Sequence, residues 1–235
     1  MKKVFQFLAI IALTIFFVSA TIPEEYKDQL KMAKESLNMD VLSISLDYNV
    51  YSATGTKIID HSSGNYTKNK GAYFYQIENT KMIQDDKWSV FIDEADKLIV
   101  VNDKNKMTTQ EFLSFDTAIE MCETIERFEN TSSYTFSLTF KGYMAKEYKQ
   151  AKITISKSNF IPQKVVFYYS NLTEYYTEKG ESKKDYLRME IKYSDIKYTS
   201  SIDCNTEKYF SYEKGSFQLK EAYRDYSIID QRLHR

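Results

Sequence analysis

Few side chains in this sequence have the types and spacing that catalysis or metal binding requires. The histidines are His61 and His234, and neither has a second histidine or a cysteine at the spacing of metal ligands. No Gly-x-Ser-x-Gly nucleophile motif occurs. Cys122 has no convincing base near it in the sequence. We therefore expect no metal site, no cofactor and no enzymatic activity, and a hydrolase with an unfamiliar site is the remaining catalytic alternative.

The clustered carboxylates are better explained by structure than by acid–base chemistry. Asp93-Glu94-Ala95-Asp96 spells a helicase tetrapeptide, but no phosphate-binding glycine–lysine loop accompanies it. It lies between two expected strands and is interpreted as a polar turn. Asp85-Asp86 is likewise interpreted as a turn, and Glu24-Glu25 as the start of a helix.

The pair Cys122 and Cys204 leaves one question open. In an oxidising compartment a disulfide closing a loop of about 80 residues stabilises a fold by roughly a few kcal/mol. Cys122 also falls on the apolar side of an expected helix, where a free thiol packs as a small hydrophobic group. Both a disulfide and two free thiols are compatible with the sequence.

The first twenty residues predict export. Two lysines precede an apolar run, Val4–Val18, which ends in Val18-Ser19-Ala20. A short basic segment, an apolar core and small residues before the cut are typical of a signal peptide cleaved after Ala20. The run is short for an uncleaved membrane anchor, and no cysteine follows it to accept a lipid. We expect residues 21–235 to be a periplasmic monomer that is not anchored to a membrane once processed.

The composition excludes nucleic acid as a partner and favours an ordered β protein. Once the two N-terminal lysines are removed, 30 basic side chains face 33 acidic ones, and both signs are interspersed. No basic stripe is present that could displace counterions from phosphates. Tyrosine (20) and phenylalanine (15) are abundant, whereas glycine (6) and proline (2) are scarce. Such a composition suits half-buried pleated surfaces and does not suit a disordered chain.

The first elements are a helix and a long strand. Tyr26, Leu30, Ala33 and Leu37 recur at helical spacing after Pro23, so we expect a helix that ends near Asn38. Strict alternation then predicts a strand over Val41–Tyr51. Further strand-like runs are Thr56–Asp60, Asn65–Lys70, Ala72–Glu78, Lys81–Gln84, Trp88–Asp93 and Leu98–Asn102, with Gly55, Gly64 and Gly71 at the joints.

A second helix is expected over residues 108–126. Thr108 and Glu111 make a capping box, and an apolar stripe follows: Phe112, Phe115, Ile119 and Cys122. The two-residue period then resumes in four segments, which contain Tyr134–Phe140, Ile153–Ile155, Val165–Tyr169 and Leu187–Tyr193. Glu178–Asp185 is interpreted as an exposed hairpin loop, and Phe217–Ile229 as a final strand.

These elements predict a mainly β fold. No linker or internal repeat divides residues 21–235, so we expect a single domain of ten or eleven antiparallel strands with two helices. The connections are too short for the helical crossovers of a parallel sheet. A strongly curved sheet wrapped over the helices covers the apolar faces most economically.

The order of elements resembles the periplasmic lipoprotein-carrier family, the LolA/LolB-like fold. The resemblance covers most of the mature chain and rests on the N-terminal helix, the capped helix and several strand segments. These segments are Val41–Tyr51, Gly64-Asn65-Tyr66, Ala72-Tyr73-Phe74-Tyr75, Trp88–Asp93, Lys97–Val101, Ile153-Thr154-Ile155 and Ile161–Phe167. It implies an unclosed β-barrel around a helical lid, with a hydrophobic cavity for acyl chains. No residue is carried over to the family's strand-borne arginine, because the arginines here come late: Arg127, Arg188, Arg224, Arg232 and Arg235.

The predicted function follows from the apolar surface. We expect a soluble carrier whose concave sheet face binds an amphiphile or the acyl chains of a lipoprotein. The alternative is an envelope protein-interaction module that uses its sheet edge or its tyrosine-rich outer face. The candidate lining residues, each of which could equally be core, are Leu42, Ile44, Leu46, Tyr48, Trp88, Phe112, Phe115 and Ile119.

Overall fold

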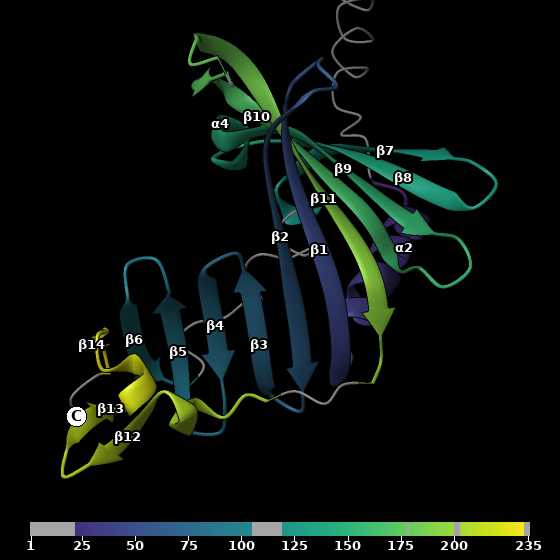
Figure 1. Ribbon diagram of the computed structural model, residues 1–235. Coiled ribbons are helices and arrows are strands. Elements are labelled where there is room, and N and C mark those ends of the chain that lie inside the picture. The colour runs from purple at the N-terminus through teal and green to yellow at the C-terminus, as the bar shows by residue number, and fades with distance from the viewer. Residues whose placement is uncertain (1–21, 105–118, 178, 200–202, 233–235) are drawn as a thin grey trace, which may run out of the picture.

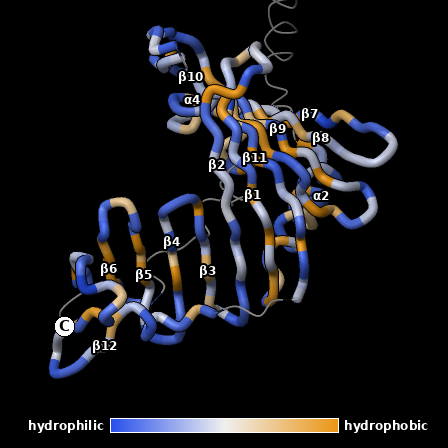
Figure 2. Tube along the Cα trace, viewed as in Figure 1, coloured by the Kyte–Doolittle hydropathy of each residue, from blue (hydrophilic) through white to orange (hydrophobic). Residues whose placement is uncertain are grey.

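The protein is a curved, open β-sheet with a helix packed against one face (Figure 1). The computed structural model describes residues 22–104, 119–177, 179–199 and 203–232. The segment expected to be a signal peptide lies outside these residues. Figure 2 shows hydrophilic residues at the turns and hairpin tips and apolar residues within the strands. The expected fold class, a mainly β chain with a strongly curved, unclosed sheet, is confirmed.

Helix α2 (Glu24–Leu37) forms where the apolar periodicity predicts it. Pro23 precedes its first turn, and Glu24 and Glu25 place negative charge at the positive end of the helix dipole. Asn38 ends it, and the Asn38 backbone N–H donates to the carbonyls of Lys34 and Glu35. The short helix α4 (Met144–Glu147) lies between strands β8 and β9 in the chain.

The strands of the large sheet follow the expected segments closely. In chain order they are β1 (Val41–Ser52), β2 (Ile58–Asn69), β3 (Ala72–Ile77), β4 (Thr80–Gln84), β5 (Trp88–Asp93), β6 (Leu98–Asp103), β7 (Cys122–Glu129), β8 (Ser133–Phe140), β9 (Tyr148–Ser156), β10 (Pro162–Tyr176), β11 (Ser182–Lys197) and β14 (Ser227–Asp230). A separate hairpin consists of β12 (Phe210–Glu213) and β13 (Ser216–Leu219).

The twelve strands lie in the order β14-β6-β5-β4-β3-β2-β1-β11-β10-β9-β8-β7. Neighbours pair antiparallel, except that β14 pairs parallel with β6. The expectation of an entirely antiparallel sheet is therefore wrong at this edge. A single strand was expected over Phe217–Ile229, but a turn at Glu221–Tyr223 divides the segment into β13 and β14. Together with β7 and β12, this gives more strands than the ten or eleven expected.

The expected helix 108–126 is wrong at its C-terminal end. Cys122–Glu129 is strand β7, which pairs with β8 and places Ile125 opposite Leu138. The β-branched Thr124 and Ile125 fit a pleated strand better than a helix, and pairing with β8 outweighs the helical spacing of Cys122. Residues 108–118 lie outside the described ranges.

Gly64 lies within a strand and not at a joint. The two runs expected around it form the single strand β2, in which Gly64 pairs with Ile77. A Cβ at Gly64 would lie 2.6 Å from the backbone oxygen of Gln76, so glycine allows the close approach of β3. Gly71, by contrast, has a φ of 89° in the β2–β3 turn, as expected of a joint.

Two hydrophobic cores lie on opposite faces of the sheet. The α2 cluster contains Leu30 and Ala33 of the helix and the inward side chains of β1 and β7–β11, such as Leu42 and Phe136. The C-terminal cluster lies on the other face of β4–β6, beneath the segment that contains β12 and β13. Its buried members are Ile83, Val90, Ile92, Ile99, Val101, Cys204, Tyr209 and Phe210.

Candidate functional site

One row of apolar side chains crosses seven strands on the face that α2 covers in part. Directly paired residues share a face of the sheet, and the pairing is continuous from β1 to β14. We call these residues the apolar row: Ile44, Tyr66, Tyr75, Met82, Phe91, Val100 and Ile229.

Burial falls along the row with distance from α2. Ile44 lies beneath the helix and is 2% exposed. Tyr75 packs against the α2 cluster, whereas Met82 and Phe91 are half-buried and, within the described residues, belong to neither core. Ile229, on the edge strand, is 44% exposed. The row therefore leads from a packed core onto apolar surface that the described helices do not cover.

The opposite side of the same strands is packed. Val90 and Ile92 flank Phe91 in β5 and are fully buried in the C-terminal cluster. Because side chains alternate in a strand, Phe91 points to the other face. Strands β4–β6 thus carry apolar residues on both faces. Only one of these faces packs into the C-terminal cluster.

Two tyrosine hydroxyls mark the place where the row leaves the helix. Tyr48 Oη and Tyr75 Oη lie 3.2 Å apart and share a hydrogen bond. Burial, with a smaller contribution from the bond to Tyr75, raises the pKa of Tyr48 well above its ordinary value. Burial also raises the pKa of Tyr73, on the same face of β3, to about 12. The Tyr48 and Tyr73 hydroxyls therefore stay neutral at physiological pH and form a polar boundary within the apolar face.

An arginine on the edge strand holds α2 in place. Arg127 of β7 forms an ion pair with Glu25 and donates a hydrogen bond to Gln29 Oε1 at 3.2 Å. Its guanidinium also lies 4.9 Å from the ring centroid of Tyr26. The sequence pattern assigned no arginine to this role. Arg127 reaches α2 because its segment is strand β7, and the sequence pattern had extended a helix into the start of this segment.

The described residues among those predicted to line a cavity do not gather at one site. Leu42, Ile44 and Leu46 are buried beneath α2 and act as packed core. Tyr48 and Ile119 are half-buried against the same cluster.

Three candidates remain. Trp88 lies on the opposite face, where its ring packs edge-on to Phe217 of the C-terminal hairpin at 5.5 Å. Phe112 and Phe115 lie outside the described residues. The outer members of the apolar row were missed, because only the register of the paired strands aligns them.

The two cysteines are free thiols, so the disulfide left open by the sequence does not form in this structure. Cys122 belongs to the α2 cluster and Cys204 to the C-terminal cluster, on opposite faces of the sheet. Burial raises the pKa of each thiol to about 12. Both thiols therefore behave as small hydrophobic groups.

The described part of the chain holds no cluster of three or more histidine, cysteine or carboxylate side chains suited to a metal ion. In the same ranges, none of the helices has the length and apolar character needed to cross a bilayer.

No protein family and no curated protein matches the sequence. Solved structures with a similar fold include a LolA superfamily protein from Nitrosomonas europaea, at 13% identity and a TM-score of 0.34 over 75% of this chain and 94% of that one. A conserved protein from Thermus thermophilus is 11% identical, with a TM-score of 0.42 over 88% of this chain and 99% of that one. A chain of the MucA/MucB complex of Pseudomonas aeruginosa is 7% identical, with a TM-score of 0.40 over 75% of this chain and 58% of that one. The LolA-like fold implied by the sequence is found among these structures, and the likeness concerns the fold alone.

Proposed function

We propose that residues 21–235 form an exported, periplasmic, non-enzymatic carrier that binds an amphiphile along the apolar row. The ligand class is an acyl chain, such as that of a lipoprotein. The observation that carries this proposal is the partial burial of Met82, Phe91 and Val100, which continue a packed core onto accessible apolar surface.

The dimensions and chemistry of the row suit an acyl chain. From Tyr75 to Ile229 the row crosses five adjacent strands, which span about 19 Å at ordinary strand spacing. Burying a methylene group contributes about 0.8 kcal/mol, so a chain laid along the row gains affinity from its length. The Tyr48 and Tyr75 hydroxyls lie on the same face and offer hydrogen bonds to a polar head.

The test is lipid binding by the mature chain. Protein purified without detergent should carry acyl lipid detectable by mass spectrometry, and the delipidated protein should bind a dansyl-labelled fatty acid. Phe91→Asp places a charge in the middle of the row and should weaken probe binding about tenfold or more.

Leu172→Asp is the matched control. Leu172 is apolar and 59% exposed on the long β10–β11 hairpin, away from the row. Probe binding by L172D should equal that of the unchanged chain. Absence of both co-purified lipid and probe binding in the unchanged chain would overturn the proposal, as would equal losses in F91D and L172D.

A second candidate function is an envelope protein-interaction module. It is favoured by the hairpin of β10 and β11, which projects beyond the neighbouring strands (Figure 1). Its end exposes Leu172, Tyr176 (70%) and Tyr186 (47%). Exposed tyrosine is typical of protein interfaces. In this case L172D would abolish capture of a protein partner from an envelope extract, while F91D would leave that capture unchanged.

A further inference from the structure

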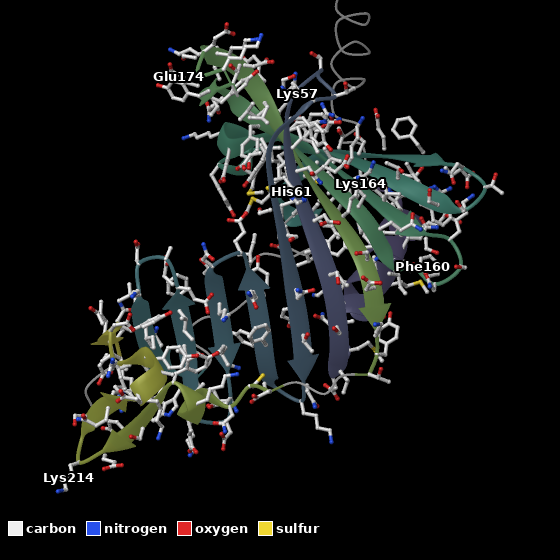
Figure 3. All side chains as sticks on the ribbon, in the orientation of Figure 1. Lys57, His61, Phe160, Lys164, Glu174 and Lys214 are labelled. Atoms are coloured by element: carbon white, nitrogen blue, oxygen red, sulfur yellow. The ribbon has the colours of Figure 1, made fainter. Side chains whose placement is uncertain are left out.

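The face of the sheet away from α2 is hollowed over strands β8–β11. The hollow has a volume of about 380 Å³. Alternation explains its polarity, because Ile153 and Val165 point into the α2 cluster while Thr154 and Lys164, their neighbours in the chain, point outward. The polar lining residues are Thr135, Lys152, Thr154, Lys164, Arg188 and Glu190. Lys164 lies on this face of β10 (Figure 3).

The lining carries more positive than negative charge. Its cations are Lys152, Lys164 and Arg188, from three adjacent strands, and its single carboxylate is Glu190. Glu190 is only 14% exposed and is shared between Lys164 at 3.6 Å and Lys192, outside the hollow, at 3.4 Å. This carboxylate is therefore already neutralised, and the hollow retains excess positive charge.

Two of the cations are held in place without a carboxylate. Arg188 Nη1 donates to the backbone oxygens of Ser52 at 2.8 Å and Ala53 at 3.0 Å. Lys152 Nζ lies 5.6 Å from the ring centroid of Tyr168. Among the described residues, neither Arg188 nor Lys152 has a carboxylate at ion-pair distance. Both of these hydrogen bonds come from Nη1, so the N–H groups of Nε and Nη2 of Arg188 can donate to a ligand.

Hydroxyl groups complete the lining. Thr135 Oγ1 and Thr154 Oγ1 lie 3.1 Å apart and share one hydrogen bond, which leaves acceptor and donor capacity on the pair. Guanidinium, ammonium and hydroxyl groups together are the donors that oxyanions prefer.

We propose that this hollow binds a phosphate group, with Arg188 and Lys152 as its charged donors. The site lies on the opposite face from the apolar row, so it takes a ligand distinct from the amphiphile's acyl chain. The recognised chemistry is the same whether the phosphate is free in solution or carried by a lipid headgroup.

The test is titration of the mature chain with inorganic phosphate and with glycerophosphoglycerol, at constant ionic strength, followed by NMR or calorimetry. We expect saturable binding with a dissociation constant on the order of 1 mM, which weakens as salt is added. Lys152→Gln should weaken binding about tenfold. Lys31→Gln, an exposed lysine of α2, is the matched control and should leave binding unchanged.

Arg188 needs a milder variant because it also holds the end of β1. Arg188→Lys keeps the charge and loses the planar fork, so binding should weaken while the thermal midpoint of unfolding stays near that of the unchanged chain. Tighter binding of glycerophosphoglycerol identifies a headgroup as the source, and tighter binding of inorganic phosphate identifies the free ion. Failure of both ligands to saturate by about 10 mM, or equal binding by K152Q and the unchanged chain, would overturn the proposal.

Discussion

The guanidinium of Arg127 donates a hydrogen bond to Gln29 Oε1 across 3.2 Å and so joins edge strand β7 to helix α2. The same group pairs with Glu25 and lies over the rings of Tyr26, at 4.9 Å, and Tyr134, at 5.1 Å. Its side chain is 18% exposed, so these contacts lie at the edge of the core. The helix is thereby held at its N-terminal half, beside the sheet edge farthest from the exposed end of the apolar row.

Replacing Arg127 by alanine should lower the free energy of unfolding by about 1–2 kcal/mol, because a partly buried ion pair, a hydrogen bond and two cation–π contacts are lost together. Urea unfolding followed by circular dichroism measures this loss. Arg224→Ala removes an exposed arginine whose ion-pair partner is Glu221, also exposed, and should cost under about 0.5 kcal/mol. Equal losses in the two variants would contradict a fastening role for Arg127.

Gly64→Ala should destabilise the protein by about 2–3 kcal/mol. The added Cβ would lie 2.6 Å from the backbone oxygen of Gln76. That oxygen belongs to a paired strand, so moving it would disrupt the pairing of β2 with β3. Gly55→Ala is the control, since its nearest contact is the rotatable side chain of Ser52, and about 1 kcal/mol or less is expected. Thermal unfolding of both variants compares the two costs, and a loss at Gly64 no larger than that at Gly55 would contradict the close approach of β3.

The local pattern of the sequence predicts the elements well because α2 and strands such as β1 and β5 carry their own periodicity. Strict alternation in Val41–Tyr51 and helical spacing in Tyr26–Leu37 depend on neighbouring residues alone. Segment Cys122–Glu129 differs, because its partner β8 decides its conformation and no local signal shows that partner.

The site was less predictable because it depends on the register between paired strands. Leu42 and Trp88 were both predicted to line one cavity, yet they lie on opposite faces. Met82, Phe91 and Val100 become one row only when β4, β5 and β6 pair in the observed register. A one-residue shift of a strand would move its side chains to the other face, and the sequence of one strand does not specify that shift.

The buried thiols should make stability depend on pH in the alkaline range. In the folded chain burial raises the pKa of Cys122 and of Cys204 to about 12, whereas the pKa of an unfolded cysteine is about 8.5. The unfolded state therefore loses its protons first, so the free energy of unfolding is undiminished below about pH 8.5 and falls as the pH rises toward 12.

Urea unfolding at a series of pH values measures this fall, and it should be shallower in a Cys122→Ala/Cys204→Ala variant. Tyr73 and Tyr209, each with a pKa raised to about 12 by burial, act in the same direction, so some fall should remain. In the folded chain at pH 8, both thiols should resist a disulfide-exchange reagent. Rapid reaction of either thiol without unfolding would contradict its burial.

Arg232 should help to hold the β12–β13 hairpin against the sheet. Its guanidinium lies 5.1 Å from the ring centroid of Trp88 in β5, 4.3 Å from that of Tyr212 and 4.5 Å from that of Phe217. Asp230 holds the guanidinium in this position, since Arg232 Nε donates to Asp230 Oδ1 at 2.8 Å. The arginine thus makes cation–π contacts with one ring of the sheet and two rings of the hairpin.

Arg232→Met keeps the length of the side chain and removes the charge, so the rings lose their cation while retaining an apolar neighbour. We expect the free energy of unfolding to fall by about 1–2 kcal/mol. Trp88 is the single tryptophan of the sequence, so its fluorescence reports this cluster alone and should shift to longer wavelength as water reaches the ring. Arg127→Ala, on the opposite face, should leave that emission unchanged. An unshifted spectrum in R232M, or the same shift in R127A, would contradict the separation of the two cores.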